Sequence, residues 1–496
     1  MAAMSESGMQ PGPRAAIVRP MLLDPDLCYR ALAARDRRFD GEFFVGVAST
    51  GIYCRPVCTA RRPRRENCTF HPSAAAAESA GFRPCLRCRP ELAPGAAPLD
   101  APERLARTAA DLIDEGALDD GSLEALASRL SVTDRHLRRV FSNHFGVAPV
   151  AYAQTQRLLL AKRLLTDTDL PITDVAYAAG FGSFRRFHAL FRARYRMAPS
   201  DLRHVRHGPA PANPGFLLAY RPPYEFDALL TFLGARTIDG VEVVADGQYA
   251  RSVRVVQRDR VHTGWITVTH AADRLGLRVT LSPGLVPVIP AVLQRTQRLF
   301  DLAANPGAIA AQLGDIAAAA PGLRLPGAFD GFELAVRAVL GQQVTVKAAR
   351  TLAGRFARAF GEPLASTVAG IDAIFPAPER VAALDVPDIA SLGVIRTRAS
   401  AILAIARAVA DGTLALTPAA DVGAQMDALR ALPGIGDWTA QYIAMRALAW
   451  PDAFPHGDLG VRKALGTHND RGTLAAAEAW RPWRGYAVMH LWRQLA

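Results

Sequence analysis

Hydrophobic positions between residues 102 and 206 recur at the three- and four-residue spacing of amphipathic helices, in a pattern that occurs twice. In the first copy, SLEALASRLS (122–131) precedes TDRHLRRVFSNHFG (133–146). In the second copy, ITDVAYAAGFG (172–182) precedes SFRRFHALFRARY (183–195). Each copy predicts a short helix of small residues, a tight turn and a basic amphipathic helix, which is the arrangement of a helix-turn-helix pair.

The second helix of such a pair enters the major groove of DNA. The groove-facing candidates are polar residues near the start of the two basic helices: Thr133, Arg135, His136 and Arg139 in the first, and Ser183, Arg185, Arg186 and His188 in the second. The alternative is an ordinary helical bundle whose arginine face is only solvated. A single copy would not decide between these alternatives, but two copies favour DNA binding.

A different pattern begins at residue 216. Four segments with strand character, at 241–245, 250–257, 265–270 and 275–281, predict antiparallel strands in a mixed α+β region. From residue 300 onward helical patterns dominate, with a turn at LPGIG (432–436). We therefore expect a multidomain, mainly α-helical protein.

Two stretches rich in Ala, Pro and Gly, at 91–101 and 207–215, predict linkers between domains. The resulting division is a disordered tail (1–20), a small α/β module (21–90), a helical domain (102–206), a mixed α+β domain (216–299) and an all-helical domain (300–496). No apolar run is long enough to span a bilayer and no cleavable leader is evident, so we expect a soluble cytoplasmic protein with no membrane partner.

The bulk composition fits this division. A chain of 496 residues, half of them hydrophobic, can hold three or four domains. The net charge of +12 is spread evenly along the chain and comes almost entirely from arginine, so by itself it indicates nucleic-acid binding only weakly.

Four of the six cysteines form two short pairs, Cys54/Cys58 with C-x₃-C spacing and Cys85/Cys88 with C-x₂-C spacing. Four thiolates complete the tetrahedral shell of one zinc ion, and this usage fits a reducing compartment better than a disulfide framework. Cys28 and Cys68 show no pairing pattern. The segment around the pairs is rich in arginine, which suggests that the zinc site meets phosphate.

The segments that carry the four cysteines resemble the N-terminal domain of the Ada family of adaptive-response DNA repair proteins. The matching segments are FVGVASTGIYCRPVC (44–58), RENCTF (65–70) and GFRPCLRC (81–88). The resemblance implies that Cys54, Cys58, Cys85 and Cys88 bind zinc and that Cys54 accepts a methyl group from a methylphosphotriester in DNA. The alternative for this module is a purely structural zinc site.

The helix-turn-helix region is similar to the AraC/XylS-type DNA-binding domain that Ada proteins also contain, most closely over GFGSFRRFHALFRARYRMAPSDLR (180–203). The resemblance implies a transcription activator with Arg135, Arg139, Arg185 and Arg186 as DNA contacts and RNA polymerase as a partner. Full Ada proteins continue with a methyltransferase that uses a cysteine nucleophile. No cysteine follows Cys88, so alkylguanine repair by that route is excluded.

The C-terminal half combines LPGIGDWTA (432–440) with FPHGDLG (454–460). In the first segment Gly434 and Gly436 allow the N–H groups of a turn to approach a phosphate, and the second segment contains Asp458. The combination resembles the helix–hairpin–helix glycosylase superfamily. The match is closest to the AlkA-type 3-methyladenine DNA glycosylase II, through the segments 221–236, 321–333, 338–344 and 480–492.

This second resemblance implies that Asp458 is the catalytic carboxylate and that Trp438, Tyr442 and Trp492 form an aromatic base pocket. A cationic alkylated purine would bind such a pocket by cation–π attraction, after being flipped out of duplex DNA. Without the resemblance, Asp458 would be interpreted as a helix N-cap and the aromatic residues as core. Trp438 occupies the position of the Schiff-base lysine of backbone-cutting members, so a monofunctional glycosylase is expected.

Gln343 lies where the AlkA prototype has a wedge leucine, and glutamine fills that space with less apolar stacking. The whole chain is thus expected to join a methylphosphotriester-sensing activator to a glycosylase, with one zinc ion, no nucleotide or organic cofactor, and double-stranded DNA in the nucleoid as its partner. The rival hypothesis is a non-enzymatic transcription regulator whose glycosylase part only docks on DNA.

Overall fold

The computed structural model describes residues 24–93, 101–119, 121–203, 214–257, 259–418 and 421–495. The predicted tail at 1–20 lies outside the described residues, and so do residues 94–100 and 207–213 of the predicted linkers. Within the described part of the chain, no helix has the length and apolar character that a membrane span needs.

The N-terminal module is a small four-stranded sheet with helices packed against it. Its elements are α1 (Pro25–Ala34), β1 (Phe44–Val47), β2 (Ile52–Cys54), β3 (Cys68–His71), α2 (Ala74–Ser79) and β4 (Arg83–Pro84). The strand order is β3-β1-β2-β4, with β4 parallel to β2. Tyr53 pairs with Pro84 across these two strands, so the next residues, Cys54 at the end of β2 and Cys85 after β4, lie side by side.

The predicted helix-turn-helix pairs are both present in the second region. Its helices are α3 (Ala101–Asp114), α4 (Leu123–Arg129), α5 (Asp134–Phe145), α6 (Pro149–Asp167), α7 (Ile172–Ala178), α8 (Phe184–Tyr195) and α9 (Pro199–Arg203). Thr133 and Ser183 cap α5 and α8 by accepting backbone N–H bonds, as expected of hydroxyl residues at that position. The apolar side of α8, Phe187, Phe191 and Tyr195, is buried and its arginines face outward.

A five-stranded antiparallel sheet forms the third region. Its elements are β5 (Gly215–Ala219), α10 (Phe226–Gly234), β6 (Glu242–Ala245), β7 (Gln248–Gln257), β8 (Arg260–Ala271), β9 (Gly276–Leu281) and α11 (Ile289–Leu299). The order is β5-β9-β8-β7-β6, and every neighbouring pair is antiparallel. The four predicted strands are confirmed as β6 to β9, whereas β5 was not predicted.

The last region is almost entirely helical. Its helices are α12 (Pro306–Leu313), α13 (Asp315–Ala318), α14 (Gly331–Leu340), α15 (Val346–Phe360), α16 (Pro378–Ala382), α17 (Val386–Ala390), α18 (Arg396–Ala410), α19 (Val422–Ala431), α20 (Asp437–Arg446), α21 (Leu459–Leu465), α22 (Asp470–Ala477) and α23 (Arg484–Arg493). A pair of two-residue strands, β10 (Glu362–Pro363) and β11 (Ala373–Ile374), departs from the expected all-helical character. The start of β11 is bonded to the region that contains the five-stranded sheet. Asp372 and Ala373 donate backbone N–H bonds to the Gly240 carbonyl oxygen.

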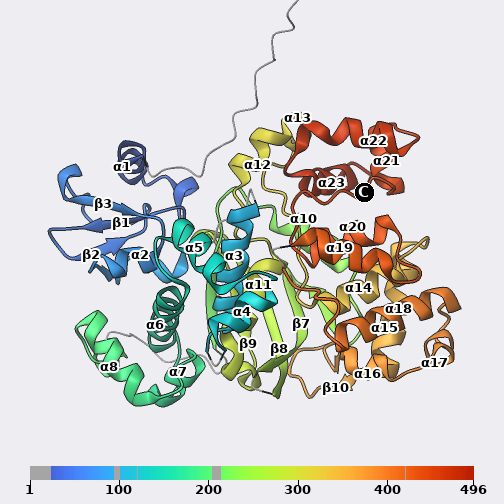
Figure 1. The fold of residues 1–496 in the computed structure, drawn as a ribbon, viewed down its shortest axis with the longest axis horizontal. Helices are drawn as coiled ribbons and strands as arrows, with labels where there is room; N and C mark the ends of the chain where they lie inside the picture. The colour runs from blue at the N-terminus through green and yellow to red at the C-terminus, as the bar shows by residue number, and fades with distance from the viewer. Residues whose placement is uncertain are drawn as a thin grey trace, which may run out of the picture.

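Neighbouring regions of the chain pack against one another through shared hydrophobic cores. One buried cluster joins residues of α6 to α8, such as Phe191, to residues of the five-stranded sheet, such as Ile266. Between the regions, Gln294 Nε2 donates to Asp111 Oδ1 at 2.7 Å and Arg221 pairs with Glu42 at 3.1 Å. Figure 1 shows the N-terminal sheet on one side of α5 and α6 and the C-terminal helices on the other side of the five-stranded sheet.

Candidate metal centre and glycosylase site

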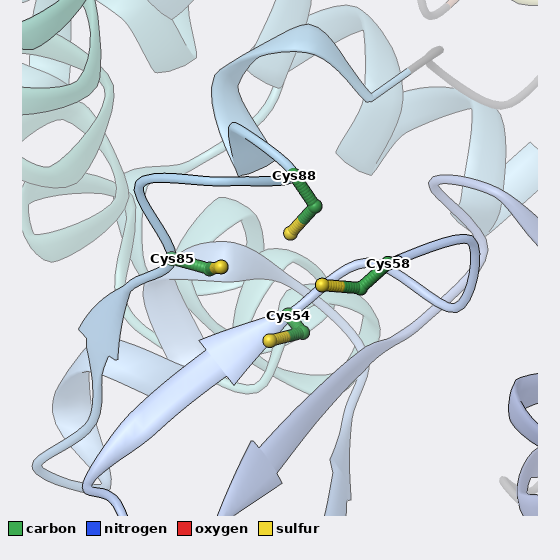
Figure 2. Close-up of side chains that lie close together, drawn as sticks. All are labelled: Cys54, Cys58, Cys85 and Cys88. Atoms are coloured by element: carbon green, nitrogen blue, oxygen red, sulfur yellow. The ribbon is translucent and has the colours of Figure 1, made fainter. Parts of the chain in front are cut away.

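The four paired cysteines meet at one point of the N-terminal module. Cys54 ends β2, Cys58 follows in the next turn, and Cys85 and Cys88 follow β4. Their Sγ atoms all lie within 4.8 Å of one another and point toward a common centre (Figure 2). In a tetrahedral shell with Zn–S bonds of about 2.3 Å, the sulfurs are separated by roughly 3.8 Å, so the cluster fits one zinc ion.

The pKa values of the four thiols depend strongly on one another. Hydrogen bonding with Cys54 lowers the pKa of the Cys58 thiol to about 7, and it lowers the pKa of Cys85 as well. Hydrogen bonding with Cys58 raises the pKa of Cys54 in return. Thiols this close cannot all ionise beside one another, and a bound zinc ion supplies the positive charge that holds four thiolates together. The predicted zinc site is confirmed, whereas Cys28 and Cys68 lie in a separate apolar cluster.

Three of the four sulfurs face backbone N–H donors. The Arg55 N–H donates to Cys88 Sγ at 3.4 Å, and the N–H groups of Ala60 and Cys88 face Cys58 and Cys85. An N–H bond withdraws charge from a sulfur ligand, so these donors offset part of the negative charge of the cluster.

The predicted DNA contacts of the helix-turn-helix pairs lie on exposed surface. Arg135 and Arg139 on α5 and Arg185 and Arg186 on α8 are all exposed. Arg139 approaches His136, the nitrogen atoms being 3.2 Å apart, within the same helix. The two basic helices therefore present cationic faces to solvent, although base contacts stay a prediction.

The hairpin between α19 and α20 brings the start of α20 to the surface. Gly434 has φ of +79°, a conformation that favours glycine, and a Cβ there would lie 3.0 Å from Ala401. Gly436 forms the N-cap of α20 without a side-chain hydrogen bond. The first N–H groups of α20 thus have no side-chain cap, as a phosphate-binding helix start requires.

Asp458 lies between two indole rings. Trp438 Nε1 donates to its Oδ2 and Trp492 Nε1 to its Oδ1, both at 2.9 Å. Asp458 is also the N-cap of α21, because its Oδ1 accepts the Val461 N–H at 2.9 Å. The N-cap interpretation is therefore confirmed, and the same side chain is also positioned by two aromatic donors, while its catalytic role stays a prediction.

The three predicted pocket aromatics form one cluster beside this carboxylate. Trp438 and Tyr442 are stacked with ring centroids 5.5 Å apart, and Tyr442 lies 6.3 Å from Trp492. They come from α20 and α23, and all three are partly buried. Trp483 is buried, whereas Trp480, like Tyr442 and Trp492, is partly buried and packs against the core.

Sequence reasoning missed three residues behind this cluster. Phe232 of α10 stacks on Trp492 at 6.3 Å, Arg236 lies 3.8 Å over the Phe232 ring, and Arg446 Nη1 donates to the Tyr442 hydroxyl at 2.8 Å. Burial alone would raise the pKa of Tyr442, but the charges of Arg446 and Arg236 outweigh it and lower that pKa. Phe232 and Arg236 lie in the segment 221–236, which resembles the AlkA-type glycosylases. That resemblance was the only signal in the sequence that could have connected them with the site.

Gln343 lies in the turn between α14 and α15, exposed and with φ of +53°. The neighbouring Gln342 anchors this turn to the hairpin: its Nε2 donates to the Gly434 carbonyl oxygen at 3.0 Å and to Thr439 Oγ1 at 2.9 Å. Arg398 also donates to the Gln342 carbonyl oxygen. The turn that would insert into DNA and the turn that would hold phosphate are thus one rigid unit, and the wedge role of Gln343 stays a prediction.

Comparison with family models agrees with this geometry. Residues 27–91 match the metal binding domain of Ada, and residues 126–204 match a helix-turn-helix domain. Residues 216–330 match the AlkA N-terminal domain, and residues 336–479 match the HhH-GPD superfamily of base excision DNA repair proteins. These four matches define a class of protein in which a zinc-containing regulator is fused to a DNA glycosylase.

The relatives identify the family. The chain is 40% identical over 488 residues to the probable bifunctional transcriptional activator/DNA repair enzyme AlkA of Mycobacterium tuberculosis, covering 95% of this chain and 97% of that protein. It belongs to this family of bifunctional transcriptional activators and DNA repair enzymes. The resemblances stated from the sequence are confirmed.

Two further relatives each match a part of the chain. DNA-3-methyladenine glycosylase 2 of Escherichia coli is 40% identical over 277 residues, which is 56% of this chain and 96% of that protein. The bifunctional transcriptional activator/DNA repair enzyme AdaA of Bacillus subtilis is 31% identical over 179 residues, which is 36% of this chain and 82% of that protein.

Proposed function

We propose that the C-terminal half excises alkylated purines of the 3-methyladenine type from double-stranded DNA by hydrolysing the N-glycosidic bond, with Asp458 as the catalytic carboxylate. The observation that carries this proposal is the position of Asp458, which two indole N–H groups hold at the edge of an aromatic cluster. The rival, a regulator with an inactive glycosylase part, would have no need of this arrangement.

The reaction uses the charge of the damaged base. As the C1′–N bond breaks, both bonding electrons leave with the cationic purine, which becomes neutral, and positive charge develops on the sugar. The Asp458 carboxylate stabilises that charge and orients the water that adds to C1′ and loses a proton. Trp438, Tyr442 and Trp492 bind the flipped base, whose cationic ring is attracted to their π faces. Trp438 stands in place of a lysine nucleophile, so the backbone is left uncut.

A base-release assay tests this step. Purified protein is incubated with methylated duplex DNA and the free bases are separated by chromatography. The Asp458→Asn variant keeps the N-cap oxygen but lacks the charge, so we expect release to fall by at least about a hundredfold, equivalent to roughly 3 kcal/mol of barrier. Equal release from both proteins would remove Asp458 from its role, and no release from either would favour the rival hypothesis.

The second proposed activity is methyl transfer to Cys54. The Cys54 thiolate attacks the methyl carbon of a methylphosphotriester, so that an S–CH₃ bond forms, an O–CH₃ bond breaks, and an anionic phosphodiester leaves. Zinc, when bound, keeps the thiolate deprotonated at neutral pH. Cys54 is favoured over its three neighbours because residues 27–91 match the metal binding domain of Ada, and Cys54 lies at the position of the methyl acceptor in that family.

Transfer changes the charge of the site. The thiolate becomes a neutral thioether, which lowers repulsion from the DNA backbone and raises DNA affinity. The helix-turn-helix pairs would then activate transcription from a promoter in the nucleoid, in contact with RNA polymerase. The structural-zinc alternative predicts no transfer.

Peptide mass spectrometry distinguishes methyl transfer to Cys54 from a purely structural zinc site. After exposure to DNA that carries methylphosphotriesters, the Cys54 peptide should gain one methyl group while the Cys58, Cys85 and Cys88 peptides stay unchanged. The Cys54→Ser variant is the control. A zinc-loaded protein with an unmodified Cys54 would support the structural alternative.

The predicted domain boundaries at 21–90, 102–206, 216–299 and 300–496 are part of the same proposal. Proteolysis at low protease concentration should cut first within 91–101 and 207–215 if these segments act as the linkers between domains.

A further inference from the structure

The predicted base pocket has charges of opposite sign at its two ends. Trp438, Tyr442 and Arg446 follow one another at four-residue intervals along α20, so their side chains lie on one face of that helix. Trp438 Nε1 donates to the Asp458 carboxylate at 2.9 Å, and Arg446 Nη1 donates to the Tyr442 hydroxyl at 2.8 Å. With a rise of about 1.5 Å per residue, the backbone positions of Trp438 and Arg446 are roughly 12 Å apart along the helix. The carboxylate and the guanidinium thus lie at opposite ends of a row of two stacked rings.

Arg446 is buried, and the groups that it contacts are neutral. The residue is 4% exposed. Its Nε donates to the Pro326 carbonyl oxygen at 2.8 Å and its Nη2 to the Gly327 carbonyl oxygen at 3.1 Å. In the part of the chain that the structure describes, Arg446 forms no ion pair. Because a guanidinium stays protonated even when buried, a full positive charge lies behind Tyr442 with little water to screen it.

A second guanidinium adds to this positive charge. Arg236 of α10 lies 3.8 Å over the Phe232 ring, and Arg446 lies 5.2 Å from the same ring. Arg236 also donates to the Phe232 carbonyl oxygen at 3.1 Å, and among the described residues it forms no ion pair. Phe232 stacks on Trp492, whose Nε1 donates to Asp458. This second row of rings therefore also has the carboxylate at one end and positive charge at the other.

The field of the two guanidinium groups reaches the rings of the pocket. Burial would raise the pKa of the Tyr442 hydroxyl, yet the charges of Arg446 and Arg236 lower it. Positive charge that favours the anionic form of this hydroxyl also disfavours a cation close to the same ring. The two arginines must therefore oppose the charge of a cationic purine bound against Tyr442.

Cation–π attraction to the aromatic rings would not by itself speed the reaction. It stabilises the bound cationic purine, but the purine loses its charge as the C1′–N bond breaks, so this stabilisation is lost in the transition state. Repulsion from the two arginines has the opposite effect, because it is relieved as the charge leaves the purine. The charge moves to the sugar, where the Asp458 carboxylate attracts it.

We propose that Arg446 and Arg236 are positioning residues of the glycosylase reaction, whose charges favour the movement of positive charge from the bound purine to the sugar beside Asp458. Arg446 acts through Tyr442, which it also holds in place, and Arg236 acts through Phe232. This role rests on the proposed glycosylase activity. It gives the inner side of the pocket a part in bond cleavage in addition to base binding.

Base release and DNA binding, measured separately, test this role. Single-turnover release is measured from a duplex that contains 7-methylguanine. Binding is measured with the same duplex carrying a 2′-fluoro sugar, which resists cleavage because fluorine destabilises positive charge at C1′. In Arg446→Met the rate of release should fall about tenfold while the dissociation constant stays unchanged or falls. Arg236→Met should show the same split with a rate about threefold slower, because that side chain is partly exposed and better screened. Arg446→Lys keeps the charge and should restore most of the rate.

A purely structural role predicts a different result, because a displaced pocket ring would weaken binding as well as slow release. Arg407→Met on α18 is the matched control: it also loses a bond to a carbonyl oxygen, that of Ala382, and should change neither quantity. Circular dichroism and thermal melting check that each variant is folded, and if Arg446→Met does not fold, Arg236→Met decides by the same criteria. Weaker binding together with slower release in the methionine variants, or release at the unmodified rate, would overturn the proposal. No release by the unmodified chain would end the glycosylase proposal as well, so the two failures are distinguishable.

Discussion

At the scale of single residues, the glycosylase site depends on a close approach that only a small residue permits. Asp458 receives three N–H donors, from Trp438, Trp492 and Val461. Gly460 lies directly beneath two of these groups: a Cβ there would be 3.1 Å from Asp458 Oδ1 and 3.3 Å from Trp492 Cδ1. The absence of a side chain at this position lets the indole reach the carboxylate.

Gly460→Ala should therefore displace Trp492 or rotate Asp458. We expect base release to slow by about tenfold, equivalent to roughly 1.4 kcal/mol, with little change in thermal stability. Gly457→Ala is the matched control, because its Cβ would meet only the end of Arg462 at 4.0 Å. Equal release rates in the two variants would show that the indole contact does not contribute to catalysis.

At the scale of elements, the structure separates two glycines that the sequence treated alike. Gly434 adopts a positive φ in the hairpin turn, and its neighbour Gly436 has φ of −84° at the helix N-cap with open space around it. The first glycine is needed for the backbone path of the turn. The second keeps the helix start open to a ligand.

Gly434→Ala should lower the free energy of unfolding by about 1–2 kcal/mol, because an L side chain is strained at that φ. Gly436→Ala should lower it by less than about 0.5 kcal/mol but raise KM for damaged DNA, since the new methyl group stands where phosphate would approach. Urea denaturation and base-release kinetics measure the two effects. Similar free energies of unfolding in the two variants would contradict the different roles assigned to Gly434 and Gly436.

A further prediction at this scale concerns the basic helix α8. Arg186 on α8 is exposed and points away from the buried Phe187 and Phe191. If it contacts a phosphate, Arg186→Ala should reduce the slope of log affinity against log salt concentration by about one for a random duplex. Fluorescence anisotropy at several salt concentrations measures the slope. Arg380→Ala, on α16, should not change it, and an unchanged slope for Arg186→Ala would exclude the contact.

At the scale of the whole molecule, the sensing module and the DNA-binding helices are joined by a buried glutamate. Glu78 of α2 is 2% exposed and accepts hydrogen bonds from the Tyr53 hydroxyl at 3.1 Å and Thr155 Oγ1 at 3.3 Å. Its backbone carbonyl oxygen accepts a bond from Arg194 of α8. Tyr53 precedes Cys54, so the site of proposed methylation is one residue from this junction.

Burial raises the pKa of Glu78 to about 7, against 4.5 for a free glutamate. Below pH 4.5 the folded and unfolded chains both hold the proton and no stability is lost. As pH rises from about 4.5 to 7 only the folded state retains it, so folding stability falls through this window. Glu78→Gln keeps both hydrogen bonds and should remove up to about 3 kcal/mol of that loss.

Thermal denaturation of the two proteins between pH 5 and 8 measures this difference. The gap in stability between Glu78→Gln and the unmodified chain should widen toward pH 7 and then stay constant. Glu379→Gln, at an exposed position on α16, is the control. Parallel stability curves would show that Glu78 does not titrate in this range.

The amino-acid sequence by itself determined the features that depend on short spacing. The cysteine pairs, the repeated helix-turn-helix pattern, the LPGIG turn and the strands β6 to β9 all follow from residues within about one element of each other, where periodicity and turn chemistry act. These features indicated the fold class, and the resemblance of the segments that carry them indicated the family.

Only the tertiary structure decided the contacts between residues far apart in the chain. Asp458 meets Trp492 across 34 residues, Phe232 reaches the pocket from a different region, and a central cavity exists only where the four regions pack together. Such contacts depend on how the buried surfaces of whole elements fit one another. A pattern within a single element carries no information about that fit.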